Sequence, residues 1–160
     1  MTGATVPDGY TLEETGWGDE ELADLIRRSA AEVLPLYEGD DLSKQRVRPL
    51  VEGDVLTVAV VRHRGRIVAT GLLSDAHGDV EVNRVAVAAG HRRQGLARAV
   101  LAELERRARA RGIRRLRLQT GFRQLPAIVL YEREGWRRIP PYGPYVEDDV
   151  VSVCFEKELS

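Results

Sequence analysis

A turn rich in arginine and glycine separates a strand-like segment from a long helical one. Residues 90–98 read Gly-His-Arg-Arg-Gln-Gly-Leu-Ala-Arg, and apolar residues then recur at helical spacing. The first amides of a helix have no internal partners and carry partial positive charge, which suits a pyrophosphate. Gly95 would let such a ligand approach the backbone, and Arg92 and Arg93 would add charge-assisted contacts. The segment favours an anion site, with a plain basic turn as the alternative.

In the segment before this turn, the positions of the apolar residues change from even to odd midway. Val80 and Val82 occupy even positions, whereas Val85 and Val87 occupy odd ones. A regular strand keeps its apolar face at one parity. A bulge near Asn83–Arg84 would explain the switch and would free backbone groups for a ligand. A strand buried on both faces needs no parity, so both interpretations stay open at this point.

Two motifs stand at a fixed separation around this segment. The first, Arg92-x-x-Gly95-x-Ala97, follows Glu81-Val82-Asn83-Arg84 and precedes the long helical segment. The second runs from the strand-like residues 116–121 through Gln124 and Ala127-Ile128 to Leu130-Tyr131-Glu132 and Gly135-Trp136. Together they resemble motifs A and B of the GNAT family of N-acetyltransferases.

The resemblance covers residues 80–159, and residues 139–143 and 152–157 are similar to a bacterial, small-molecule-type branch of the family. Two positions depart from the usual pattern. Ala97 stands where glycine is commoner, and Ala86 stands where a bulky aromatic is frequent. The resemblance implies acetyl-CoA as acetyl donor and an N-acetyltransferase activity toward an amine.

Coenzyme contacts are also implied by the resemblance. The bulged strand is expected to offer backbone groups of Val85 and Val87, with Ala86 between them, to the pantetheine arm. Gln124 lies where the family often places a polar contact to the same arm. The pyrophosphate is expected on the turn formed by Arg92, Arg93, Gln94, Gly95, Leu96, Ala97 and Arg98.

Amine acetylation requires proton transfer. An alkyl ammonium has a pKa near ~10.4, so a base must take its proton at neutral pH. Glu81 is the candidate base, with an ordinary solvated carboxylate as the alternative. Tyr131 matches the family's general-acid position, with a buried aromatic as the alternative. Cys154 reads as core packing, so no covalent nucleophile is indicated and both substrates should bind together.

The loop 140–145 reads Pro-Pro-Tyr-Gly-Pro-Tyr. Its three prolines predict a preformed wall, and Tyr142 and Tyr145 could close over a small acceptor. The acidic residues Glu147, Asp148 and Asp149 follow and would attract an ammonium. We therefore expect a small free amine such as an amino acid, a polyamine or a peptide end, although a rigid hairpin with a solvated acidic tip fits the same residues.

The helices and strands that would position these residues indicate a single α/β domain over residues 1–160. We expect a mixed α+β sheet of the GNAT fold, with a coenzyme-binding core at residues 80–135. About seven strands and roughly four helices are expected. Leu22, Leu25, Ile26, Val33 and Leu34 form one helical stripe, and Leu96, Val100, Leu104 and Ala108 form another. The strands are expected at 10–17, 56–62, 67–73, 80–88, 114–120, 136–139 and 150–157.

Composition argues against several other classes. The net charge of -1 offers no cationic field to nucleic acid or to an anionic membrane. One cysteine, no apolar leader and no bilayer-length stretch predict a cytoplasmic protein. His63, His77 and His91 lack metal-ligand spacing, so no metal is expected.

Two further functions and one assembly question stay open. The arginine-rich run 106–117 is the basis for a nucleic-acid-binding alternative, although Glu103–Arg107 and Glu105–Arg109 are spaced as helix-surface pairs. An acetyl-CoA sensor without turnover is the other alternative. A homodimer is neither indicated nor excluded.

Overall fold

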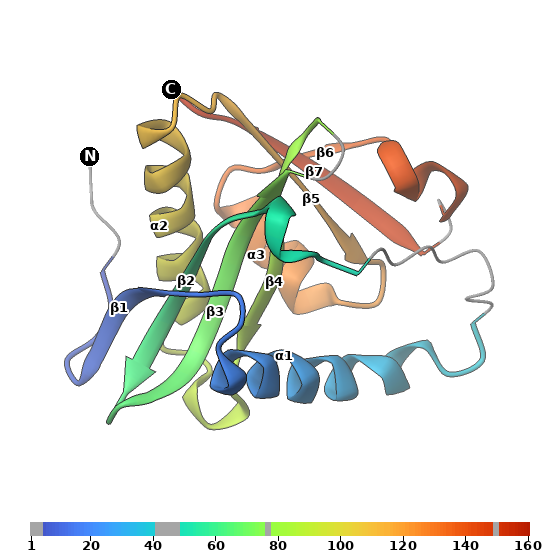
Figure 1. Ribbon diagram of the computed structural model, residues 1–160. Helices are drawn as coiled ribbons and strands as arrows, with labels where there is room; N and C mark the ends of the chain where they lie inside the picture. The colour runs from blue at the N-terminus through green and yellow to red at the C-terminus, as the bar shows by residue number, and fades with distance from the viewer. Residues whose placement is uncertain (1–4, 41–48, 76–77, 149–150) are drawn as a thin grey trace.

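The computed structural model describes residues 5–40, 49–75, 78–148 and 151–160 (Figure 1). A seven-stranded mixed sheet runs through it in the order β1-β2-β3-β4-β5-β7-β6. The strands are β1 (Tyr10–Thr15), β2 (Val55–His63), β3 (Arg66–Asp75), β4 (Val80–Val87), β5 (Arg115–Gly121), β6 (Arg137–Ile139) and β7 (Ser152–Glu158). Only β4 and β5 pair in parallel. The expected mixed sheet and its strand–helix–strand crossover are confirmed.

The described helices are α1 (Glu20–Val33), α2 (Leu96–Ala110) and α3 (Leu125–Arg133), with short 3₁₀ helices η1 (Leu34–Tyr37), η2 (Glu52–Asp54), η3 (Ala89–His91) and η4 (Gly143–Asp148). The Asp19 carboxylate caps α1 by accepting from the amides of Glu21 and Leu22 at 2.9 and 3.2 Å. Gly112, with φ 76°, follows the end of α2 as expected. The Pro/Tyr-rich loop 140–145 differs from its expected form, because its second half is coiled into η4, which continues to Asp148.

Helix α1 packs on one face of the sheet and α2 on the other. Leu22 and Leu25 join a buried cluster with residues of β2 and β3, and the predicted stripe of α2 is fully buried in the second cluster. The expectation that Leu34 belongs to the buried stripe is wrong, because its side chain is 66% exposed. The α-helix gives way to η1 there, and a 3₁₀ helix with three residues per turn shifts the stripe out of phase.

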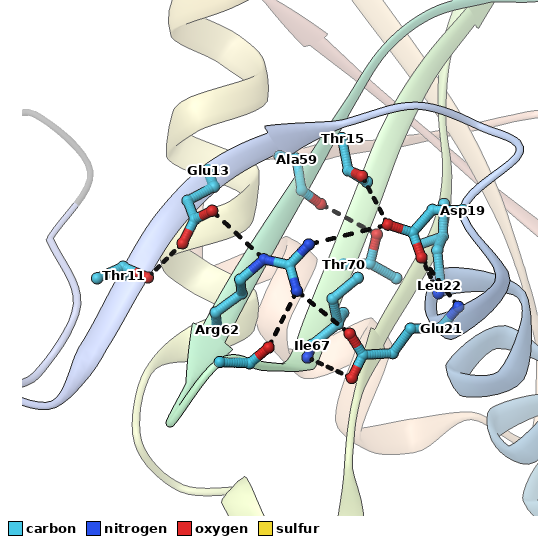
Figure 2. A network of polar contacts seen from close by, with 11 residues as sticks. Thr11, Glu13, Thr15, Asp19, Glu21, Leu22, Ala59, Arg62, Ile67 and Thr70 are labelled. Carbon is cyan, nitrogen blue, oxygen red and sulfur yellow. Dashed lines mark hydrogen bonds and ion pairs between the residues drawn. The ribbon is translucent and has the colours of Figure 1, made fainter.

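One arginine ties α1 to the first three strands (Figure 2). The Arg62 guanidinium of β2 lies 3.3 Å from Glu13 Oε1, 3.8 Å from Asp19 Oδ2 and 3.2 Å from Glu21 Oε1. Glu21 also accepts from the backbone amide of Ile67 in β3 at 3.1 Å. Because Asp19 is the N-cap of α1, this network fixes where the helix begins over the sheet.

The hairpin between β2 and β3 turns through Arg64 and Gly65. Both residues have positive φ, 51° and 78°, which two-residue hairpin turns of this kind require. Arg64 is exposed at the tip of the turn.

The predicted bulge in β4 is confirmed. On β3, Gly71 is the single residue between the paired Thr70 and Leu72, whereas two residues of β4, Arg84 and Val85, lie between their partners. Arg84 takes the left-handed conformation with φ 57°. The extra residue returns the later valines to the face that packs against α2, so valines of both parities join the same cluster.

Gly71 is required where α2 crosses the bulge. A Cβ at this position would lie 2.6 Å from Val100 Cγ1, 3.2 Å from Leu104 Cδ1 and 3.4 Å from Val85 Cγ2. Val100 and Leu104 are themselves fully buried, so neither has free space to move into. The absence of a side chain therefore lets α2 lie close against the distorted strand.

Replacing Gly71 with alanine should lower the free energy of unfolding by about 1–3 kcal/mol, because the added methyl group overpacks this contact. Urea unfolding followed by circular dichroism measures the change. Gly53→Ala is the matched control, since a Cβ there meets nothing within 4 Å. It should change stability by less than about 0.5 kcal/mol. Equal stability of Gly71→Ala and the wild type would contradict this packing.

Candidate active site

The candidate active site lies where β4 and β5 separate. These strands pair at one position, Glu81 with Arg117, and Figure 1 shows β1–β4 and β5–β7 diverging. A cavity of about 580 Å³ occupies this region. Residues 81–86 of β4 and 119–121 of β5 line it from the sheet. Helices α1 and α3 and the η4 segment complete its walls.

Glu81 is a buried carboxylate of this cavity, with an exposed fraction of 4%, and Asp148 of η4 is a second one, at 5%. Glu81 Oε2 accepts from Asn83 Nδ2 at 3.3 Å and from the Tyr145 hydroxyl at 3.4 Å. The Ser74 hydroxyl donates to Asn83 Oδ1 and thereby orients that amide. Within the described residues, the buried Oε1 of Glu81 has no hydrogen-bond partner. An unpaired carboxylate oxygen is costly in such a place, so it is available to a ligand that donates a proton.

The two tyrosines of the Pro/Tyr-rich segment take different places. Tyr145 lines the cavity, whereas Tyr142 is not a lining residue and packs behind it, with ring centroids 5.3 Å apart. The Arg117 guanidinium lies 5.0 Å from the centre of the Tyr142 ring. Burial, followed by the nearby charge of Glu81, raises the pKa of both tyrosines, so both stay protonated at neutral pH.

Tyr131 of α3 lines the same cavity and is 7% exposed. Its ring is held by Trp136 and Phe155, at centroid distances of 6.1 and 5.8 Å. Burial raises the pKa of Tyr131 to about 12. The phenol therefore remains a proton donor throughout the neutral range, and α3 packing fixes its direction.

The turn before α2 has the geometry of an anion site. Gly95 is the N-cap of α2 with φ 73°, and no side chain caps the helix, in contrast to α1. The first helical bond of α2 is donated by Ala99 to the Gly95 carbonyl, which leaves the preceding amides of the turn without intrahelical partners. This turn is not among the residues that line the cavity.

Arginines of this turn are anchored by neighbouring elements. Arg92 Nε donates to the Val87 carbonyl at 3.3 Å, and its guanidinium pairs with Glu32 of α1. Arg98 lies 3.1 Å from Glu134 at the end of α3. Arg93 has a positive φ of 62°. The turn is thus held to α1, β4 and α3 together.

Of the expected pantetheine contacts, Val85, Ala86 and Gln124 line the cavity, whereas Val87 does not. Gln124 lies beside a close contact between Tyr37 and Gly121 that the sequence did not reveal. The Tyr37 hydroxyl accepts from the Arg123 amide at 3.2 Å, and a Cβ at Gly121 would lie 1.7 Å from that hydroxyl. Only glycine at 121 lets the end of η1 reach the cavity rim.

Several lining residues were not predicted. Helix α1 contributes Ile26, Ser29, Ala30 and Val33. Helical periodicity indicates that a face is apolar but not which cavity it borders, so no signal in the sequence points to them. Arg84 also lines the cavity. Its place in the suspected bulge was the signal that could have drawn attention to it.

Other reactive side chains do not form a second centre. Cys154 is 1% exposed, and burial raises the pKa of its thiol to about 11, so it stays a thiol. The Tyr10 hydroxyl bonds His91 Nδ1 at 2.9 Å, and the His63 ring lies 4.7 Å from the Tyr10 ring. His77 lies outside the described residues. No group of three potential metal ligands occurs among the residues that were placed.

The arginine-rich run is largely engaged within the molecule. The predicted helix pairs are present, with Arg107 at 3.9 Å from Glu103 and Arg109 at 3.8 Å from Glu105. Arg111 donates to the Leu56 carbonyl at 2.9 Å. The predicted pairing is therefore present, but Glu103 and Glu105 are each only 7% exposed, so these pairs are largely buried against the molecule and not on a solvated surface. No helix in the described part of the chain has the length and apolar character needed to cross a membrane.

The chain matches the acetyltransferase (GNAT) family over residues 20–136. It is 33% identical to an IAA acetyltransferase of Azospirillum brasilense over 126 aligned residues. This alignment covers 78% of this chain and 81% of that protein. A solved structure from Klebsiella pneumoniae, described as an acyl-CoA N-acyltransferase, has a TM-score of 0.76 and 34% identity over 94% of this chain and 98% of that one. A GNAT acetyltransferase of Elizabethkingia anophelis with acetyl-CoA bound shares the fold, with a TM-score of 0.67 and 16% identity over 96% and 100% of the two chains.

The fold and these comparisons define an acyltransferase. This chain belongs to the GNAT family of acetyltransferases, as motifs A and B suggested.

Replacing Gly95 with glutamate should abolish measurable binding of acetyl-CoA, because the side chain would bring negative charge to the turn expected to hold the pyrophosphate. Isothermal titration calorimetry with acetyl-CoA measures the affinity. Gly95→Ala is the matched control, since it carries the same backbone strain at φ 73° without the charge. A Cβ there meets nothing within 4 Å, so both variants should fold. Equal affinities of the glutamate and alanine variants would contradict this placement.

Proposed function

We propose that the protein transfers the acetyl group of acetyl-CoA directly to a primary amine of a small molecule, with both substrates bound together. The observation that carries this proposal is that one cavity holds both Glu81, with an unpartnered carboxylate oxygen, and the protonated Tyr131. A proton acceptor and a proton donor facing one space are what an amine and a thioester need to react.

In this proposal, acetyl-CoA binds to the bulged part of β4, to Gln124 and to the start of α2. Backbone groups of β4 around the bulge, at Val85 to Val87, hold the pantetheine arm, and Gln124 gives a polar contact to it. The uncapped start of α2, with Arg92, Arg93 and Arg98 around it, holds the pyrophosphate. This arrangement would bring the thioester to the divergence of β4 and β5, within the cavity.

Proton transfer in this proposal begins at Glu81. Its free Oε1 takes one proton from the substrate ammonium, directly or through water, and passes it to solvent. The neutral nitrogen forms a bond to the acetyl carbonyl carbon, and the bond from that carbon to sulfur then breaks. Tyr131 donates its proton to the departing thiolate, and the second proton, which the nitrogen loses as the amide forms, restores the Tyr131 phenol through solvent. The products are an N-acetyl amide, free coenzyme A thiol and one released proton.

The covalent route has little support in the described residues. The only cysteine is fully buried, is not a lining residue of the cavity, and has a pKa raised by burial. A thiol of this kind is a poor nucleophile at neutral pH. Direct transfer between two bound substrates is therefore the simpler mechanism.

A small acceptor fits the size of the cavity, about 580 Å³, which is partly open to solvent. Tyr145 and Pro144 of the η4 segment and helix α1 stand on either side of it. A protein acceptor would call for an open groove or sheet edge that reads extended backbone. The walls instead suit a compact amine that enters beside the thioester.

Initial rates of thiol release should give intersecting lines when acetyl-CoA and a small amine are varied together, because both must be bound before transfer. The assay is run first over a panel of amino acids, polyamines and short peptides to find the acceptor. Parallel lines and an isolable acetyl-enzyme would contradict direct transfer.

Two further outcomes bear on the acceptor and on turnover. Faster acetylation of protein lysines than of every small amine would overturn the acceptor class. Tight binding of acetyl-CoA without turnover of any amine or protein would favour the sensor alternative.

Tyr131→Phe should lower kcat by ~10²-fold while leaving the affinity for acetyl-CoA nearly unchanged, because it removes a proton donor and little volume. Steady-state kinetics and calorimetry on the same preparation measure the two quantities. Tyr10→Phe is the matched control and should retain turnover, because Tyr10 lies at the start of β1, where it bonds His91, and does not line the cavity. Wild-type turnover in Tyr131→Phe would contradict its role as proton donor and indicate that Tyr131 only packs in the core.

A further inference from the structure

The cavity is lined by one arginine that has no ion pair and no side-chain hydrogen bond with another described residue. Arg84, the bulged residue of β4, lines the cavity beside Tyr145 and is half-buried. Within the described residues, no carboxylate lies within 4.0 Å of its guanidinium, and no hydrogen bond of its side chain is found. Burial lowers the pKa of Arg84, with the nearby Tyr145 hydroxyl acting against this.

Among the half-buried arginines that the structure describes, only Arg84 lacks a counter-ion, although exposed ones such as Arg64 and Arg93 also lack one. Arg62 has three carboxylates around it, Arg117 is within 3.2 Å of both Asp79 and Glu156, and Arg123 pairs with Asp40. Removing a guanidinium from water without a counter-ion costs free energy, so a partly buried and unpaired arginine calls for an anion from outside the chain. The strained backbone of Arg84 at φ 57° also fixes the position from which its side chain enters the cavity.

Opposite charges therefore flank the place where an acceptor would lie. Tyr145 lies near both groups, since its hydroxyl donates to Glu81 at 3.4 Å and its side chain lines the cavity together with Arg84. Glu81 presents a free oxygen for an ammonium, whereas Arg84 presents a planar fork of donors that matches a carboxylate. Glu81 and Arg84 do not form an ion pair with each other, so the two side chains are separated.

We propose that the acceptor is a zwitterion of the amino-acid type, whose carboxylate binds Arg84 while its ammonium faces Glu81. This inference rests on the proposed function and narrows it, because it disfavours polyamines and simple alkyl amines. The cavity of about 580 Å³ has room for the end of the pantetheine arm together with a small molecule of this kind. Arg84 acts as a specificity residue, since its contact is to a part of the acceptor that does not react.

The test compares amino acids with their own amides. The two members of a pair share the side chain and the reacting nitrogen, and differ in the carboxylate. Loss of the carboxylate lowers the pKa of the neighbouring ammonium, so an amide has more free amine and would react faster if the carboxylate contributed nothing. Thiol release should nevertheless give a kcat/KM about 10- to 100-fold higher for the acid of the best pair, which is the range expected for a charge-assisted contact.

Arg84→Gln should reduce that preference to within about threefold, mainly by raising KM for the acid, with acetyl-CoA affinity retained. Arg84→Lys keeps the charge without the planar fork and should keep part of the preference. Arg64→Gln is the matched control, because it removes an exposed arginine at a similar positive φ, 51°, in the β2–β3 turn. It should leave both acceptors and their ratio unchanged.

The outcomes separate this inference from the proposed function. Acetylation of small amines with no preference for the acid, or an equal loss for acid and amide in Arg84→Gln, would overturn the role of Arg84 and leave the transferase intact. A loss of acetyl-CoA affinity in Arg84→Gln would assign the cation to the coenzyme and also overturn it. Absence of turnover with every small amine would instead contradict the proposed function itself.

Discussion

The bulge in β4 is the constraint on which the rest of the structure depends. Two residues, Arg84 and Val85, stand opposite the single Gly71. This mismatch puts valines of both parities under α2 and brings that helix against a backbone with no side chain. It also bends β4 at the point where its pairing with β5 has ended, so the sheet opens into a cavity at its centre. A regular strand would close this space with continuous hydrogen bonds.

Opening the sheet leaves polar groups that the chain does not satisfy by itself. Glu81 Oε1 in the cavity and the Tyr142 hydroxyl behind it are buried without hydrogen-bond partners among the described residues, as are Arg109 Nε and Trp136 Nε1 elsewhere, and Arg84 has no counter-ion. Away from the cavity, most charged side chains have partners, as the Arg62 network and the pairs along α2 illustrate (Figure 2). Incomplete pairing near a cavity lowers stability and prepares the site for ligands that complete it.

The two substrates of a GNAT enzyme are served by different kinds of group in this molecule. The start of α2 offers backbone amides around an N-cap that has no side chain, which suits the phosphates of a shared donor. The cavity proposed to take the acceptor is lined by side chains from β4, α1, α3 and η4, which can vary without disturbing the fold. Membership of the family therefore identifies the donor chemistry, whereas the acceptor depends on individual residues such as Arg84 and Tyr145.

Local patterns in the sequence determined most of the fold. Helical stripes, the Arg64–Gly65 turn, the glycines at 95, 112 and 135 and the parity change in β4 each depend on neighbours in the chain, and the structure agrees with them. Linked motifs likewise identified the family and placed Glu81 and Tyr131. The sequence could not show that α1 forms a wall of the cavity, that Tyr142 packs behind Tyr145, or that Arg84 is left without a counter-ion. Those facts depend on contacts between residues distant in the chain, and only the tertiary structure decides which side chains meet and which charge remains unpaired.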